Sequence, residues 1–169
     1  MKPKEKGFRS KGAVGALLDE YEKALRELYQ TIEVLDNNLL TTVVDAQTKD
    51  EDCKSIQTIL THVLQSGYTY VLEIRKWLGE EIEYKDKVVY KNVHDYKSAL
   101  IEMFCFTETL FIDHPDIKLT EFDLNRKITV RWGQTFDVEQ LMQHAIVHIL
   151  RHRRQIEKFK LKLKARLLL

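Results

Sequence analysis

Apolar residues recur every three to four positions over long parts of the chain, and charged residues fill the positions between them. This period is typical of amphipathic helices that bury one face. Pro115 ends the third such stretch, because the residue before a proline is driven out of the helical region. The pattern predicts four helices, at residues 11–36, 54–78, 95–112 and 138–163.

The fourth predicted helix has the best-defined start. Asp137 is a candidate N-cap, and Gln140 stands three residues later, as in a capping box. Phe136 and Leu141 have the spacing of a hydrophobic staple around the same N-cap. The inward stripe of this helix then passes through His148 or Ile149, His152, Ile156 and Phe159. Histidines therefore occupy positions where a helix of this kind normally buries aliphatic side chains.

The segments between the helices carry weaker signals. Residues 37–52 collect Asn, Thr and Asp and are expected to form a connection, with Asp52 or Ser55 as the N-cap of the next helix. Residues 80–92 are expected to form a loop with a short extended piece at 87–90. The sequence KITVRW at 127–132 alternates apolar and polar residues, which indicates a short strand or extended arm that cannot form a sheet alone. The predicted fold is all-α, a four-helix bundle with this extended segment before the last helix.

Length and composition agree with one helical domain. The chain has 169 residues with only 6 Gly and 2 Pro, which favours long helices over a turn-rich β fold. We expect a single domain over residues 1–169, with residues 1–10 as a flexible N-terminal arm.

Charge and cysteine content exclude several function classes. With 27 basic and 26 acidic residues the net charge is +1, so no field of the whole molecule attracts nucleic acid or an anionic membrane, and neither is expected as a partner. No stretch reaches transmembrane length or has the core of a signal peptide. Cys53 and Cys105 form no CxxC pair and are read as reduced thiols of a cytoplasmic protein, with Cys105 as an unreactive core residue.

Three of the six histidines lie four residues apart on the fourth predicted helix. Four residues is just over one turn, so His144, His148 and His152 share a face, and a pair at this spacing can bind one metal ion. Helical phase favours His148 and His152 over His144. A catalytic site of the zinc type needs a third protein ligand, and His62 on the second helix is the candidate.

Other polar residues and motifs were considered beside this histidine group. Gln65, Gln143 and Gln155 are candidate acceptors for the second ring nitrogens of the histidines. His94 and His114 lie in predicted loops or at helix ends, where solvated or capping roles are expected. No Glu-x-x-His pair, P-loop, GxGxxG or GxSxG motif is present. The competing interpretation is a non-catalytic bundle for binding or dimerisation, in which the histidines are structural.

The arrangement resembles the DinB/YfiT-like superfamily of metal-dependent enzymes, which are four-helix bundles. The resemblance rests on His148-Ile-Leu-Arg-His152-Arg153-Arg154-Gln155 and on Thr61-His62-Val63-Leu64-Gln65-Ser66. It implies that His62, His148 and His152 bind a divalent ion such as zinc or nickel and leave one position open. Arg154 departs from the glycine of many relatives and is expected to point outward.

The resemblance also implies a class of chemistry. The superfamily suggests transfer of a low-molecular-weight thiol to a small-molecule electrophile, or hydrolysis by a metal-activated water. The catalytic groups beyond the metal, the substrate and any thiol-binding residues are left open. A homodimer that pairs through helix faces is a further expectation for a bundle of this kind.

Overall fold

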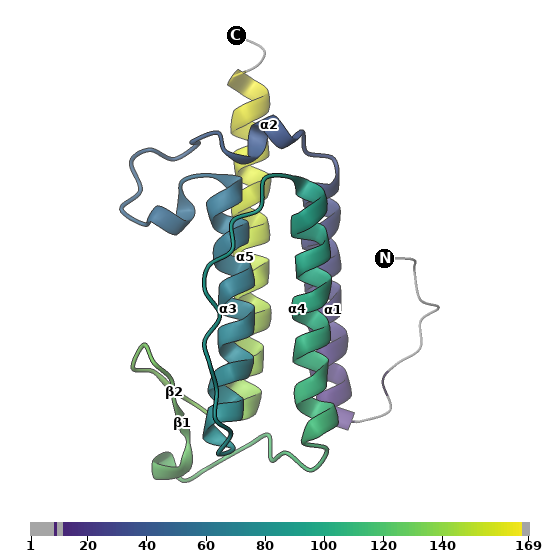
Figure 1. Cartoon of the computed structure of the whole chain (residues 1–169), viewed down its shortest axis with the longest axis vertical. Helices are drawn as coiled ribbons and strands as arrows, with labels where there is room; N and C mark the ends of the chain where they lie inside the picture. The colour runs from purple at the N-terminus through teal and green to yellow at the C-terminus, as the bar shows by residue number, and fades with distance from the viewer. Residues whose placement is uncertain (1–8, 10–11, 167–169) are drawn as a thin grey trace.

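The computed structural model describes residue 9 and residues 12–166, and this part of the chain is mostly helical (Figure 1). Within it there are four long helices, α1 (Gly12–Glu33), α3 (Ile56–Trp77), α4 (Val93–Asp113) and α5 (Val138–Arg166). The short elements are α2 (Asn37–Leu40), the 3₁₀ turns η1 (Glu51–Cys53) and η2 (Leu124–Arg126), and the strands β1 (Ile128–Thr129) and β2 (Thr135–Phe136). The all-α prediction is confirmed.

The four long helices run side by side (Figure 1). α1 contacts α4 and α5, and α3 contacts the same two helices from the other side. The core between them includes Tyr21, Leu28, Ile74, Tyr96 and Met103, each at most 1% exposed. Full burial of an aliphatic side chain of this size contributes roughly 1.5–3 kcal/mol. The apolar stripes read from the sequence therefore hold the long helices together.

Hydrogen bonds at the helix starts fix where α3 and α5 begin. Ser55 caps α3 in a capping box with Thr58, so Ser55 is the N-cap and Asp52 is not. At α5, the Asp137 carboxylate accepts the backbone N–H of Gln140 at 2.8 Å, and the Gln140 amide oxygen accepts the N–H of Asp137 at 3.0 Å. The predicted capping box of the last helix is confirmed, and Asp52 is left free for another role.

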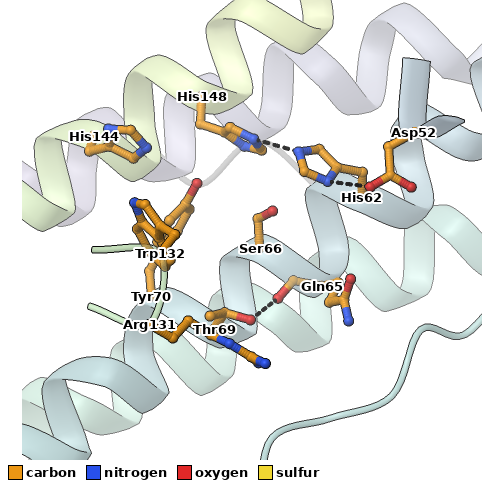
Figure 2. A pocket seen from close by; sticks show the side chains of 10 residues that line it. All are labelled: Asp52, His62, Gln65, Ser66, Thr69, Tyr70, Arg131, Trp132, His144 and His148. Carbon is orange, nitrogen blue, oxygen red and sulfur yellow. Dashed lines mark hydrogen bonds and ion pairs between the residues drawn. The ribbon is translucent and has the colours of Figure 1, made fainter. Parts of the chain in front are cut away.

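The segment 127–132 does find a strand partner. β1 pairs antiparallel with β2, with Ile128 opposite Phe136, and Gly133 takes a positive φ of 88° in the turn between them. The sequence analysis did not identify β2, because two residues are too few to show alternation. The hairpin lies against one end of α3 and α5, and it carries Trp132 toward the space between these helices (Figure 2).

The segment 80–92 runs along α3 without forming a strand (Figure 1). The expected extended piece at 87–90 therefore has no strand partner, and its last residue, Tyr90, bonds to side chains instead. The carbonyl of Tyr90 accepts a hydrogen bond from the Gln57 side chain, and its N–H donates to the Tyr96 hydroxyl. These contacts satisfy the backbone where a sheet partner is missing.

Cys105 was expected in the core, and this expectation is wrong: its side chain is exposed on α4. The inward face of α4 passes through Met103, Phe104 and Thr107, which are buried, and the helical period turns position 105 away from it. Cys53, by contrast, is buried. On α4, therefore, Phe104 is buried and the next residue, Cys105, is exposed, although the sequence around them is apolar.

The expected N-terminal arm, residues 1–10, lies outside the described residues except for Arg9. The guanidinium of Arg9 forms ion pairs with Asp19, Glu22 and Glu108. This residue is therefore attached to α1 and α4.

None of the described helices combines the length and apolar character that a membrane crossing requires.

Candidate metal site

His62 from α3 meets His148 and His152 from α5. One ring nitrogen from each histidine lies within 4.8 Å of the others. The Nε2 atom of His148 is 3.0 Å from Nε2 of His62 and 3.1 Å from Nε2 of His152, and Figure 2 shows the rings of His62 and His148 pointing toward one another. The three residues expected from the sequence are therefore together, and the group could hold a metal ion.

These spacings match the separations of nitrogen ligands around one small cation. Zinc-to-imidazole bonds of about 2.0–2.1 Å give nitrogen separations of about 3.3 Å at a tetrahedral angle and about 2.9 Å at a right angle. The observed 3.0 and 3.1 Å lie between the two values. The Nε2 atom of His148 therefore lies at a coordination spacing from the Nε2 atom of each of its two partners, for tetrahedral and for octahedral geometry alike.

The opposite ring nitrogens of two histidines face protein acceptors. Nδ1 of His62 is 3.2 Å from the Asp52 carboxylate, and Nδ1 of His152 is 3.1 Å from the side-chain oxygen of Gln155. Acceptors at these positions hold the proton on Nδ1, so that Nε2 presents a lone pair. Of the three glutamines expected as acceptors, Gln155 has this role, whereas Gln65 lines a cavity and Gln143 bonds to Glu139.

With the proton on Nδ1 in His62 and His152, both rings present an Nε2 lone pair toward His148. Its Nε2 faces the Nε2 lone pairs of both His62 and His152. A neutral imidazole carries one N–H, which cannot donate well to two acceptors at once. A cation among the three nitrogens accepts all three lone pairs together. The donor set therefore fits a metal ion better than it fits a closed hydrogen-bond network.

Burial keeps these imidazoles neutral. It lowers the pKa of His148 to about 2, with further lowering by the neighbouring histidines, and lowers the pKa of His152 to about 4. Burial also lowers the pKa of His62, against the opposing effect of the Asp52 and Asp50 carboxylates. At neutral pH all three are in the form that binds metal ions.

Sequence reasoning missed Asp52 as a contact of the site. It was considered only as an N-cap, ten residues before His62 in a connection without periodicity. In the structure η1 brings its carboxylate to the ring of His62, and the same carboxylate accepts hydrogen bonds from Lys87 at 2.6 and 2.8 Å. The only signal in the sequence was an acidic residue near a candidate ligand.

A cavity of about 510 Å³ lies beside the histidines between α3 and α5 (Figure 2). His62 and His148 line it, whereas His152 is 2% exposed and is not among the lining residues. The other lining residues are Asp52, Gln65, Ser66, Thr69, Tyr70, Arg131, Trp132 and His144. Two candidate ligands can therefore be reached from a space large enough for a small molecule.

His144 is a neighbour of the three-histidine group. Its ring is nearly parallel to that of His148, at 21°, with centroids 6.4 Å apart, and it lines the cavity. The metal-ligand grouping contains His152 and not His144, as helical phase predicted.

The remaining histidines and the motif arginines are elsewhere. His94 is exposed and His114 is the C-cap of α4, as expected, and the half-buried ring of His114 also bonds to Glu80. Arg153 forms ion pairs with Glu27 on α1 and with Glu157. Arg154 is exposed and points outward, as expected.

Comparison of the chain with protein-family models and with curated proteins gives no match. The features that matter for function are the three imidazoles, their acceptors and the adjoining cavity.

Proposed function

We propose that this protein is a metal-dependent enzyme of the DinB/YfiT-like superfamily, in which α1, α3, α4 and α5 form the four-helix bundle. His62, His148 and His152 bind one divalent ion, zinc or nickel. The observation that carries the proposal is the meeting of three Nε2 atoms, two of them from rings whose Nδ1 atoms face Asp52 and Gln155.

The position of the cavity supports a catalytic role over a structural one. Structural metal sites are closed by four protein ligands, whereas catalytic sites use three and keep a position for water or substrate. Within the described residues the grouping contains three ligands. Since His62 and His148 line the cavity, a small-molecule substrate reaches the site from that side.

A divalent ion on these ligands would act as a Lewis acid, which favours the ionised form of a thiol or a water molecule at neutral pH. The protein residues would hold and orient the ligands. Asp52 fixes the ring of His62, and Gln155 fixes the ring of His152 and also accepts a hydrogen bond from the Cys53 thiol. Tyr70 and Trp132 line the cavity beside the histidines. Transfer of a low-molecular-weight thiol and hydrolysis both fit this arrangement.

The competing interpretation makes the histidines structural parts of a binding or dimerisation module. Structural histidines donate to and accept from other protein groups. Here the Nε2 atom of His148 faces two Nε2 atoms that its single N–H cannot satisfy together, and the site adjoins a cavity. These two features support the enzyme over the structural module.

Elemental analysis of protein purified without an affinity tag tests the metal site. We expect about one equivalent of a divalent metal per chain, and loss of most of it in His148→Ala. His144→Ala is the matched control, since it removes an imidazole from the same helix face and should retain the metal. A protein without stoichiometric metal, or equal metal content in wild type and His148→Ala, would contradict the proposal.

Activity assays with the metal-loaded protein separate the two reactions. A panel of small thiols with a chromogenic electrophile detects thiol transfer, and a chromogenic ester detects hydrolysis. We expect one of the two activities to depend on added metal and to be lost in His148→Ala. If neither activity rises above that of His148→Ala, both proposed reactions are wrong.

A further inference from the structure

Arg131 lines the same cavity and is not part of the histidine group. In Figure 2 it lies beyond Thr69, away from the contact between His62 and His148. Within the described part of the chain its guanidinium stacks on Tyr84 and forms no ion pair with a carboxylate. A cation beside a ligand-sized cavity without a protein anion is available to an anionic ligand.

A buried carboxylate holds Arg131 in place. Glu73, which is 2% exposed, accepts a hydrogen bond from the backbone N–H of Arg131 at 3.2 Å and from the Tyr84 hydroxyl at 2.8 Å. The ring of Tyr84 lies under the guanidinium, and the Cζ atom of Arg131 is 4.4 Å from the centroid of this ring. Both contacts restrict the arginine before any ligand arrives, which lowers the entropic cost of binding.

Aromatic rings form another part of the cavity lining. The rings of Tyr70 and Trp132 meet edge to face with centroids 5.8 Å apart, and His144 lies 5.5 Å from Tyr70 and 6.4 Å from Trp132. Trp132 remains 40% exposed, so its ring has surface left for a ligand to cover. Aromatic side chains of this kind stack with planar rings.

We propose that the cavity binds planar aromatic carboxylates, with the carboxylate on Arg131 and the ring against Tyr70 and Trp132. The proposal rests on the proposed function in one respect, since it names the substrate class of the same metal site. The guanidinium provides the paired donors that match a carboxylate. The cavity volume of about 510 Å³ lies in the usual range for small-molecule sites.

Isothermal titration calorimetry with 2-naphthoate and its neutral analogue 2-naphthamide tests the proposal. The purified wild-type protein is expected to bind naphthoate about tenfold more tightly, the lower end of the range for a charge-assisted hydrogen bond, because Arg131 is exposed. Arg131→Met should abolish this preference and leave naphthamide binding unchanged, which also shows that the cavity is intact. Arg126→Met, the matched control, should keep the preference.

Two further variants separate the contacts. Tyr84→Leu removes the ring under the guanidinium and should reduce the preference for naphthoate about threefold without changing the binding of naphthamide. Trp132→Ala should weaken both probes alike. Equal binding of the two probes by wild type, or an unchanged preference in Arg131→Met, would overturn the proposal.

The outcome is independent of the metal site, because metal content is measured separately on the same samples. If the protein holds metal but does not prefer naphthoate, only this inference fails. If the preference is present in protein that never holds metal, the anion site stands and the proposed enzyme fails.

Discussion

Asp52→Asn is expected to lower the metal affinity of the three-histidine site about tenfold. The substitution keeps the size of the side chain and an oxygen that can accept from His62, so the tautomer of the ring is preserved. It removes the negative charge that makes the imidazole a stronger ligand. Loss of such an outer partner typically costs 10- to 100-fold in affinity.

The structure places this effect at the lower end of that range. The Asp52 side chain is 29% exposed, and its charge is shared with Lys87, whose amine lies 2.6 and 2.8 Å from the two carboxylate oxygens. Solvent and the lysine already offset part of the charge before the substitution is made. A tenfold loss corresponds to about 1.4 kcal/mol.

Competition with a chromophoric zinc chelator at constant ionic strength measures the affinity. Asp45→Asn is the matched control, because it removes the same charge from the same connection and its carboxylate bonds to backbone N–H groups. Lys87→Gln should raise the affinity or leave it unchanged, since the lysine repels a cation. Equal affinities in wild type and Asp52→Asn, or an equal loss in Asp45→Asn, would refute the reasoning.

Three other predictions concern the protein without metal. The lowered pKa values of the buried site histidines mean that the unfolded chain takes up more protons below pH 6.5, so stability should fall as the pH drops from 6.5 to 5, by up to about 1.4 kcal/mol per pH unit for each neutral histidine. Urea unfolding at several pH values checks this, and a flat profile would count against it. Gly67→Ala should cost about 1–3 kcal/mol, because its Cβ would lie 2.0 Å from the sulfur of Met103. In a double-mutant cycle with Met103→Ala this cost should shrink, and additive effects would show that there is no clash. An aromatic disulfide reagent should modify Cys105 quickly in the native protein and Cys53 only after unfolding, and two fast thiols would contradict their exposures.

Local signals in the sequence predicted most of the helical structure. The period of apolar residues, the N-cap at Asp137 and the stop before Pro115 involve neighbours along the chain, so they can be read without a tertiary structure. The pairing of His148 with His152 is of the same kind, because one helical turn brings them together whatever surrounds them. His62 was added by the need for a third ligand and by the resemblance to a known family.

Errors and omissions arose where distant segments meet. The exposure of Cys105 depends on which side of α4 faces α1 and α3, and β2 exists because a two-residue segment found a partner. η1 brings Asp52 to His62, and the β1–β2 hairpin brings Arg131 to the cavity. No local sequence pattern connects either segment to the histidines.

The sequence by itself determined the helices and the histidine pair on one of them, since these follow from the geometry of a single helix. Only the tertiary structure decided that His62 closes the group, that Asp52 and Gln155 orient it, and that a cavity lies beside it. The physical reason is that ligand spacing, burial and pKa depend on distances between segments, and packing of the whole chain sets those distances.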